Sequence, residues 1–309
     1  MREEFMKKTW VVWLGALVCC FLWGSAFPCV KLGYKWMEID AADTAAQILY
    51  AGLRFTLAGI LAVVIGSLLQ RRILYPTVEA LPKVVGLSML QTVLQYIFFY
   101  VGLAHTTGVK SSIIVGTNVF VAILVSGYLF HMEQVTARKI LGCVVGFAGV
   151  VLVNFSNGMD VSFSFFGEGF IFFSTFAYAF SSVMLKKLSK EYNPVMLSGY
   201  QFVIGGIIMV IGGKIAGGRL GNYSGPAIGM LLWLALVSAI AYSLWGVLLK
   251  YNPVSKVAVF GFMNPVFGVI LSAIFLKEGS MLGTKCLIAL VLVSIGILVV
   301  NREKEVKNE

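Results

Sequence analysis

Six polar or aromatic side chains of this chain fall inside stretches that are otherwise apolar, where water is not at hand to satisfy them. Their amides donate and accept hydrogen bonds, and their aromatic rings supply apolar walls. Such a combination predicts a cavity for a small amphiphilic solute, although interhelical hydrogen bonding would explain any one of these residues taken singly. The candidate binding residues are Trp23, Gln95, Asn118, Tyr178, Trp245 and Asn264.

Two prolines stand in the middle of apolar stretches, where each removes a backbone hydrogen bond. Pro28 frees the carbonyl group of Gly24. Pro265, directly after Asn264, frees that of Gly261. A freed carbonyl on a glycine lets a helix bend or open, so Gly24, Pro28 and Pro265 are candidate hinge or gating residues. A kink that only adjusts helix packing is the alternative.

Arg54 is the ionisable residue that lies well inside an apolar stretch. A charge at that depth is costly unless it is paired or reaches water. We expect Arg54 to make a structural or gating contact with Asp40, with Asp43 or with carbonyl groups at a helix end. Recognition of a substrate anion and snorkelling to the interface are the alternatives. The matching residue in the second half of the chain is the neutral Gln201.

No grouping of residues in the sequence is typical of an enzyme or a cofactor site. We find no nucleophile with a base, no phosphate-binding loop and no metal cluster, so we expect no catalytic residue, no metal and no cofactor. All 14 Asp and Glu residues fall in loops, tails or helix ends, which argues against a proton relay through a membrane-embedded carboxylate. The five cysteines show neither disulfide nor metal spacing, and free thiols are expected.

The composition requires lipid as the solvent, because 59% of the residues are hydrophobic, 12% are charged and the mean hydropathy is +0.90. Roughly 20 residues are needed to span a bilayer core of about 30 Å. The charge-poor stretches that meet this need are 10–30, 47–69, 82–103, 109–130, 139–155, 165–185, 195–213, 227–249, 255–276 and 283–300.

The chain is a duplication, because two stretches 147 positions apart read alike. Residues 51–60 match residues 198–207 at Gly52 and Gly199, and again at Gly59 and Gly206. Five spans in each copy, an odd number, force the second copy into the bilayer upside down. We therefore predict an all-α integral membrane protein with ten transmembrane helices, built as two inverted five-helix repeats over residues 1–156 and 157–309.

The net charge of +10 is explained by membrane orientation, and we expect no nucleic acid partner. With the N-terminus inside, sixteen of the 24 Lys and Arg residues lie in cytoplasmic segments and seven lie outside. This bias places both termini in the cytoplasm. The expected location is the cytoplasmic membrane of a prokaryote, and the expected partners are the lipid bilayer and a small solute. Whether the chain is a monomer or a homodimer is left open.

Several short motifs resemble those of the EamA family of the drug/metabolite transporter superfamily. They are the Trp-Gly-Ser-x-Phe motif at 23–27, Leu-Arg-Phe at 53–55, the Asn264-Pro265 pair, Glu133 and Glu278 after the fourth and ninth spans, and the Gly-rich fifth span. The resemblance covers nearly the whole chain in two copies. The sequence departs from the family pattern at Val119, where the family commonly has proline.

The resemblance implies a basket of ten helices around a central cavity built from the first, third, fourth, sixth, eighth and ninth spans. It also implies export or exchange of amino acids or related metabolites by alternating access. A multidrug or nucleotide-sugar-like exchanger is the alternative within transport, although a phosphate-bearing substrate should need more cations than Arg54 in the cavity. A membrane interaction protein without transport activity is the alternative from another class.

Tags on Met1 and Glu309 test the predicted topology. Both should stay inaccessible to membrane-impermeant labels in sealed cells and become labelled after permeabilisation, because the cationic segments remain inside. Labelling of either tag on intact cells would refute the orientation.

Overall fold

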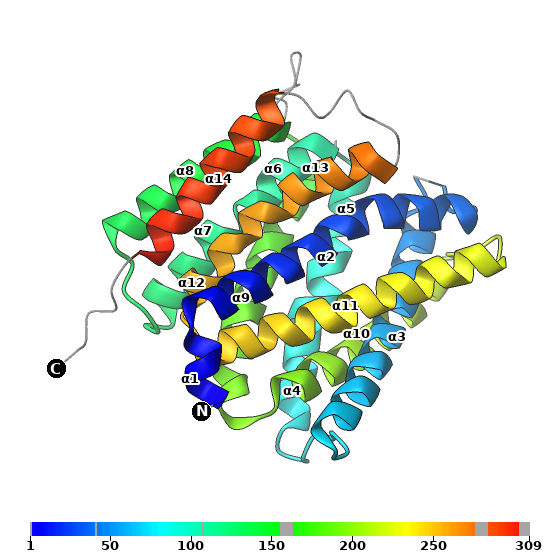
Figure 1. Ribbon diagram of the computed structural model, residues 1–309. Coiled ribbons are helices and arrows are strands. Elements are labelled where there is room, and N and C mark those ends of the chain that lie inside the picture. Colours follow the sequence, from blue (N-terminus) through cyan, green and yellow to red (C-terminus); the bar gives the residue numbers. More distant parts are fainter. Residues whose placement is uncertain (1, 41, 107, 155–162, 276–283, 303–309) are drawn as a thin grey trace.

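The protein is all-helical over the described residues, which are 2–302 apart from 41, 107, 155–162 and 276–283 in this computed structural model (Figure 1). This part of the chain contains no strand, in agreement with the predicted fold class. Three segments are π-helical (η1, η2, η3) and one is a 3-10 helix (η4). The elements are α1 (Arg2–Lys7), α2 (Thr9–Trp36), α3 (Thr44–Gln70), α4 (Leu81–Ser88), η1 (Met89–Leu94), α5 (Gln95–Ala104), α6 (Gly108–Gly116), α7 (Asn118–Leu124), η2 (Val125–Leu129), α8 (Ala137–Asn154), η3 (Phe165–Gly169), α9 (Phe170–Glu191), α10 (Pro194–Ile215), α11 (Gly225–Tyr251), α12 (Val254–Ala258), η4 (Val259–Phe262), α13 (Met263–Phe275) and α14 (Thr284–Asn301).

Six helical segments in the described part are long and apolar enough to cross a bilayer, and each contains one of the predicted ranges. They extend beyond the predicted ends, since α2 runs to Trp36 and α9 to Glu191. The backbone hydrogen bonds of a helix continue beyond its apolar stretch into the membrane–water interface, where the side chains are polar. The length of the apolar stretch therefore does not show where the helix ends. Shorter apolar helices cover Ile113–Leu129, Val254–Gly268 and Leu287–Asn301. The long segments are Thr9–Trp36, Thr44–Gln70, Leu81–Ala104, Phe165–Glu191, Pro194–Ile215 and Gly225–Tyr251.

The helices α3 and α10 touch through their backbones, because glycines line both sides of the contact. Gly52 faces Gly206, and Gly59 faces Gly199. A Cβ atom added to Gly52 would lie 2.6 Å from the backbone nitrogen of Val210, closer than side chains tolerate. Lipid provides no hydrophobic force between helices, so this close packing is what holds the pair together.

The helices α8 and α14 pack in the same manner and lie side by side in Figure 1. A Cβ atom on Gly142 would lie 2.9 Å from the carbonyl oxygen of Gly296, and one on Gly149 would lie 2.8 Å from that of Ala289. The glycine spacing singled out in the sequence therefore serves helix contact in both pairs.

The remaining helices surround these two pairs in a regular pattern of contacts. The helix α2 packs on α11 and α13, and α9 packs on α5 and α7. In addition, α3 packs on α11, whereas α10 packs on α4 and η1. Side chains from α2, α5, α9 and α11 meet at the centre of this arrangement.

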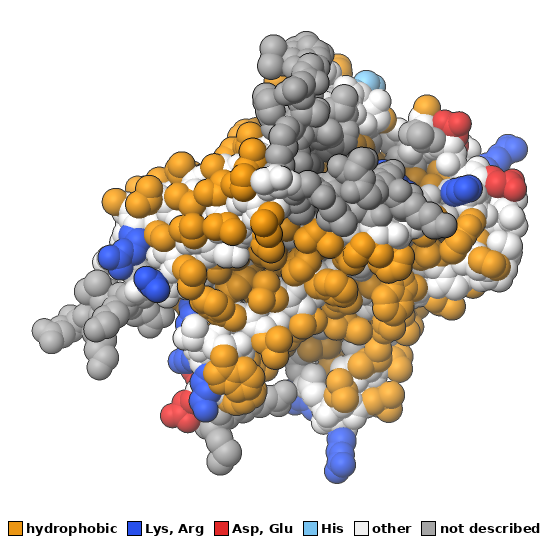
Figure 2. All heavy atoms as spheres, turned by 45° about the horizontal axis from the view of Figure 1, so that its top comes forward, with side chains coloured by type: hydrophobic (Ala, Val, Ile, Leu, Met, Phe, Trp, Pro, Cys, Tyr) orange, Lys and Arg blue, Asp and Glu red, His pale blue; other side chains and the backbone are white. Residues whose placement is uncertain are grey.

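Apolar side chains cover most of the visible face of the molecule, and charged side chains lie at its margins (Figure 2). Large apolar residues such as Leu69, Ile73 and Ile215 are 80%, 79% and 81% exposed. A continuous apolar surface of this kind is incompatible with water but matches the hydrocarbon core of a bilayer.

Substitution of Gly206 by alanine tests the glycine contact. The new Cβ atom would lie 2.5 Å from the backbone nitrogen of Thr56, so α3 and α10 must separate. We expect a loss of about 1–3 kcal/mol in stability, measured as a lower thermal unfolding midpoint in detergent. The control is Gly212→Ala on the same helix, where nothing lies within 4 Å of the new atom. Equal midpoints for the two variants would show that the close contact is unimportant.

Candidate functional site

Aromatic rings from three helices meet in the interior of the molecule. The ring of Trp23 on α2 lies 5.0 Å from that of Tyr242 and 5.0 Å from that of Trp245, both on α11. The hydroxyl groups of Tyr242 and of Tyr96 on α5 share a hydrogen bond of 2.7 Å. Edge-on ring packing of this kind is favourable and forms a firm apolar wall. We call Trp23, Tyr96, Tyr242 and Trp245 the aromatic cluster.

Two more predicted site residues adjoin the aromatic cluster. Gln95 interacts with the hydroxyl of Tyr242. Tyr178 on α9 lies near Tyr96 and Tyr242. The structure thus brings together four of the six predicted binding residues, namely Trp23, Gln95, Tyr178 and Trp245.

The other two predicted residues, Asn118 and Asn264, each follow a local change of hydrogen bonding within a segment that stays helical. A turn at Thr117 separates α6 from α7, and Asn118 is the first residue of α7. The 3-10 helix η4 separates α12 from α13, and Asn264 is the second residue of α13. The side-chain oxygens of both asparagines are buried without a hydrogen-bond partner. Distorted helices with unpaired polar groups are typical of binding sites inside membrane proteins.

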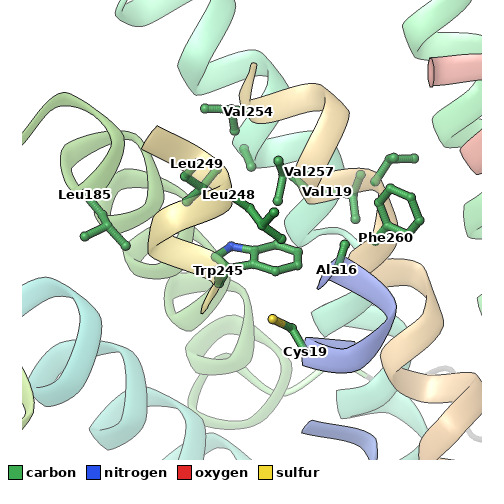
Figure 3. Close-up of a cluster of buried hydrophobic side chains, with 14 of the residues drawn as sticks. Ala16, Cys19, Val119, Leu185, Trp245, Leu248, Leu249, Val254, Val257 and Phe260 are labelled. Atoms are coloured by element: carbon green, nitrogen blue, oxygen red, sulfur yellow. The ribbon is translucent and has the colours of Figure 1, made fainter. Parts of the chain in front are cut away.

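The turn at Thr117 forms without proline. The hydroxyl and the backbone N–H of Thr117 both donate to the carbonyl oxygen of Ile114, at 2.6 and 2.9 Å, which tightens the turn. Val119 packs beside Val257 of α12 and Phe260 of η4 in the second half of the chain (Figure 3). The absence of proline at Val119 therefore does not prevent a local distortion in the first half.

Amide side chains of the third segment also lie unpaired. Gln91 sits in the π-helical turn η1, and Gln95 follows directly after it. The side-chain oxygens of both are buried without a partner. π-Helical turns are frequent at functional sites because they shift side chains out of the regular helical register. Gln91, Gln95, Asn118 and Asn264 together offer hydrogen-bond acceptors with no donor among the described residues.

Arg54 lies among tyrosines and has no carboxylate partner in the described part of the chain. The expected partners are engaged locally, since Asp40 accepts from the N–H of Ala42 and Asp43 from that of Ala46. The guanidinium carbon lies 4.4 Å from the centre of the Phe55 ring. The predicted contact with Asp40 or Asp43 is therefore wrong, because both carboxylates serve the turn that begins α3. The tyrosines around Arg54 are Tyr34, Tyr50, Tyr96 and Tyr100.

The helix α2 passes through Pro28 without interruption. A Cβ atom on Gly24 would lie 2.5 Å from the Cβ of Phe267, so this glycine allows α2 to approach α13 closely. Gly24 thus has a packing role. The predicted hinge at Pro28 stays a prediction, whereas Pro265 lies at an observed change from 3-10 to α-helix.

Glu133 links the two halves of the chain away from the aromatic cluster. Its carboxylate accepts hydrogen bonds from the Ser126 hydroxyl at 2.8 Å, from the Ser255 N–H at 3.0 Å and from the Ser255 hydroxyl. It also pairs with the Lys139 ammonium at 2.9 Å. Burial alone would raise the pKa of Glu133, but the Ser255 and Lys139 contacts outweigh it and hold the pKa below its ordinary value. We call this group of four residues the Glu133 network.

The comparison with known proteins agrees with this arrangement. A model of the EamA-like transporter family matches residues 9–155 and residues 165–302. The chain belongs to the EamA-like transporter family.

Two relatives of this EamA-like chain that cover nearly all of it are named as transporters. An uncharacterized transporter of Archaeoglobus fulgidus is 29% identical over 96% of this chain and 100% of its own length. The uncharacterized transporter YvbV of Bacillus subtilis is 26% identical over 91% of each chain. A known crystal structure shares the fold, with a TM-score of 0.75 and 16% identity over 93% of this chain and 94% of that one. The protein is therefore a membrane transporter by family.

The six predicted residues did not include Tyr96 and Tyr242 of the aromatic cluster, and sequence reasoning also missed two of the tyrosines around Arg54 in this EamA-like protein. Tyr34 and Tyr50 lie near helix ends, where tyrosine is commonly interfacial. One signal was available, because Tyr50 precedes Arg54 by four residues and so shares its helix face. Tyr34 comes from a different helix and could be placed beside Arg54 only by the fold.

The lowered pKa of Glu133 predicts a pH-dependent stability. The network contributes fully above the ordinary carboxyl value of 4.5 and is lost as the pH falls through the lower folded-state value. We expect Glu133→Gln to lower stability by about 1–3 kcal/mol near neutral pH and to flatten the acid dependence of the unfolding midpoint.

The matched control is Glu191→Gln, because Glu191 pairs with Lys83 at the exposed surface. This change should shift the midpoint little. Parallel acid profiles for wild type and Glu133→Gln would contradict the assigned network.

Proposed function

We propose that this EamA-like protein is a secondary transporter, an exporter or exchanger, of small organic solutes. Amino acids or related metabolites are the proposed substrates, moved by alternating access. The observation that carries the proposal is the pair of asparagines, Asn118 and Asn264, whose side-chain oxygens are buried without a partner among the described residues, next to local distortions of two helical segments. Burying unpaired amide groups inside a membrane protein is energetically costly unless a ligand or water forms hydrogen bonds with them.

The packing pattern supports two inverted repeats, residues 1–156 and 157–309, with ten spanning segments. Exchange of the halves maps α2 onto α9, and it maps α11 onto the third spanning segment, which consists of α4, η1 and α5. The contact of α2 with α11 thereby becomes the contact of α9 with α5. The same exchange turns the α3 contact with α11 into the α10 contact with α4 and η1. It also maps the Gly52–Gly206 contact onto Gly199–Gly59. Pseudo-symmetry of this kind underlies alternating access in many transporters.

The Glu133 network supports a gate at one end of the molecule. It ties the loop after η2 in the first half to the N-terminus of α12 in the second half. Both segments are cytoplasmic in the proposed topology, in which the two termini face the cytoplasm of a prokaryotic cell. Figure 1 places α1 and the C-terminal end of α14 at the same end of the helices, as this topology requires. Opening toward the cytoplasm would break the Glu133 network.

The alternatives fit the structure less well. A multidrug or nucleotide-sugar-like exchanger needs either a wide apolar cavity or several cations for phosphate, and Arg54 is the one cation beside the aromatic cluster among the described residues. An interaction protein without transport activity has no need for two distorted helices with unpaired amides.

Counterflow in proteoliposomes tests the proposed site. Asn264→Ala and Tyr178→Phe should each weaken the apparent affinity by up to roughly tenfold, because one polar contact contributes about 0.5–1.5 kcal/mol. Pro265→Ala should instead change turnover, since it alters the local distortion of the helix and not a ligand contact. The control is Asn222→Ala in the loop before α11, which should leave counterflow unchanged. Wild-type behaviour of both Asn264→Ala and Tyr178→Phe for every transported solute would place the site elsewhere.

A further inference from the structure

We propose that the transported solute carries a carboxylate group that Arg54, Tyr34 and Tyr50 bind. This inference rests on the transport function proposed above and names the chemical class of its substrate. Its basis is a buried set of unpaired donors next to the aromatic cluster.

Arg54 is a buried cation without a counter-charge. The side chain is only 6% exposed, and its Nε has no hydrogen-bond partner among the described residues. Arg54 lies ten residues into α3, about 15 Å along the helix at 1.5 Å per residue, well within a bilayer core. Contact with the Phe55 and Tyr96 rings offsets only part of the cost of burying the charge. A bound anion would therefore stabilise this side chain.

Two phenol groups beside Arg54 are also unpaired. The rings of Tyr34 and Tyr50 lie 5.4 Å apart, edge to face, and both hydroxyls are buried without a partner. The Tyr50 hydroxyl lies against Gly33, where a larger residue would displace it. One guanidinium and two hydroxyl donors suit the two oxygens of a carboxylate. A phosphate would require more positive charge than Arg54 supplies.

The proposed anion site is continuous with the aromatic cluster. The Arg54 guanidinium lies 6.0 Å from the Tyr96 ring, and the Tyr96 hydroxyl bonds to Tyr242. Gln95 lies beside the Tyr242 hydroxyl, and its side-chain oxygen is an acceptor without a partner among the described residues. A solute with its carboxylate at Arg54 could thus rest its body on Tyr96 and donate a hydrogen bond to an amide oxygen. An amino acid carries both a carboxylate and an ammonium group that donates hydrogen bonds.

The second half of the chain shows that this position does not need a cation for packing. Gln201, the counterpart of Arg54, is 0% exposed and accepts a hydrogen bond of 2.5 Å from Thr92. A neutral residue therefore fills the equivalent place. The charge of Arg54 serves a purpose that the fold alone does not require, which favours ligand binding over a structural role.

The first experiment uses wild-type protein in counterflow with labelled L-amino acids, monocarboxylates, amines and nucleosides. Each transported acid is then compared with its own carboxamide as a competitor. We expect carboxylates alone to accumulate, and the acid to compete about tenfold or more better than the amide. Accumulation of amines or nucleosides, or equal competition by acid and amide, would overturn the carboxylate proposal while transport stands. No accumulation of any solute would overturn the transport function itself.

The second experiment tests whether Arg54, Tyr34 and Tyr50 cause the preference for the acid over its carboxamide. Arg54→Gln, which copies the second half, should reduce the ratio of acid to amide competition to near one, and Arg54→Lys should restore it in part. Tyr34→Phe and Tyr50→Phe should each weaken acid competition several-fold and leave amide competition unchanged. The control is Arg72→Gln, an exposed arginine just after α3. An unchanged ratio in Arg54→Gln, or in both tyrosine variants if Arg54→Gln does not fold, would refute the site.

Discussion

The backbone contact between α3 and α10 is the constraint on which the rest of the structure depends. Each helix presents two glycines, and each glycine lies against one of the other helix, so the contact reads the same when the two halves are exchanged. Any side chain at these four positions would push the helices apart. Because α3 carries Arg54 and α10 carries Gln201, this contact also fixes the distance between the two positions that differ most in chemistry.

Unpaired polar groups are concentrated around the centre, although a bilayer gives them no water. Four amide oxygens, two tyrosine hydroxyls and Arg54 Nε are all buried without a partner. By contrast, the Glu133 carboxylate is hydrogen-bonded and paired, and Thr92 donates to Gln201, although the Nε2 of Gln201 and several serine hydroxyls also lack a partner among the described residues. Unpaired groups of this number destabilise the protein unless a ligand or water meets them. Their location therefore marks the part of the fold kept for binding.

The sequence predicted the all-helical fold and its long spans, but only some of the contacts at the candidate site. Apolar length placed the long helices, and the matching glycines of the two halves indicated the repeat, but not that α3 and α10 touch at these glycines. Asn118 and Asn264 were among the predicted binding residues, but the turn at Thr117 was not predicted, because the Thr117 hydroxyl and not a proline makes it. The partner of Arg54 was predicted wrongly, since a short local turn holds Asp40 and Asp43. Tyr34 could not be found, because its proximity to Arg54 depends on how α2 packs against α3.

The difference between Arg54 and Gln201 has a consequence for energetics. In the proposed alternating-access cycle, two identical inverted halves would give inward-open and outward-open states that are related by a two-fold rotation and have equal free energy. Because Arg54 and Gln201 differ in charge, we expect the two empty states to differ in free energy. Detailed balance then ties the ratio of the solute affinities at the two membrane faces to how far the bound solute changes this difference, while the gradients alone decide the net direction of flow. A difference at one pair of residues would thus make the proposed cycle kinetically asymmetric.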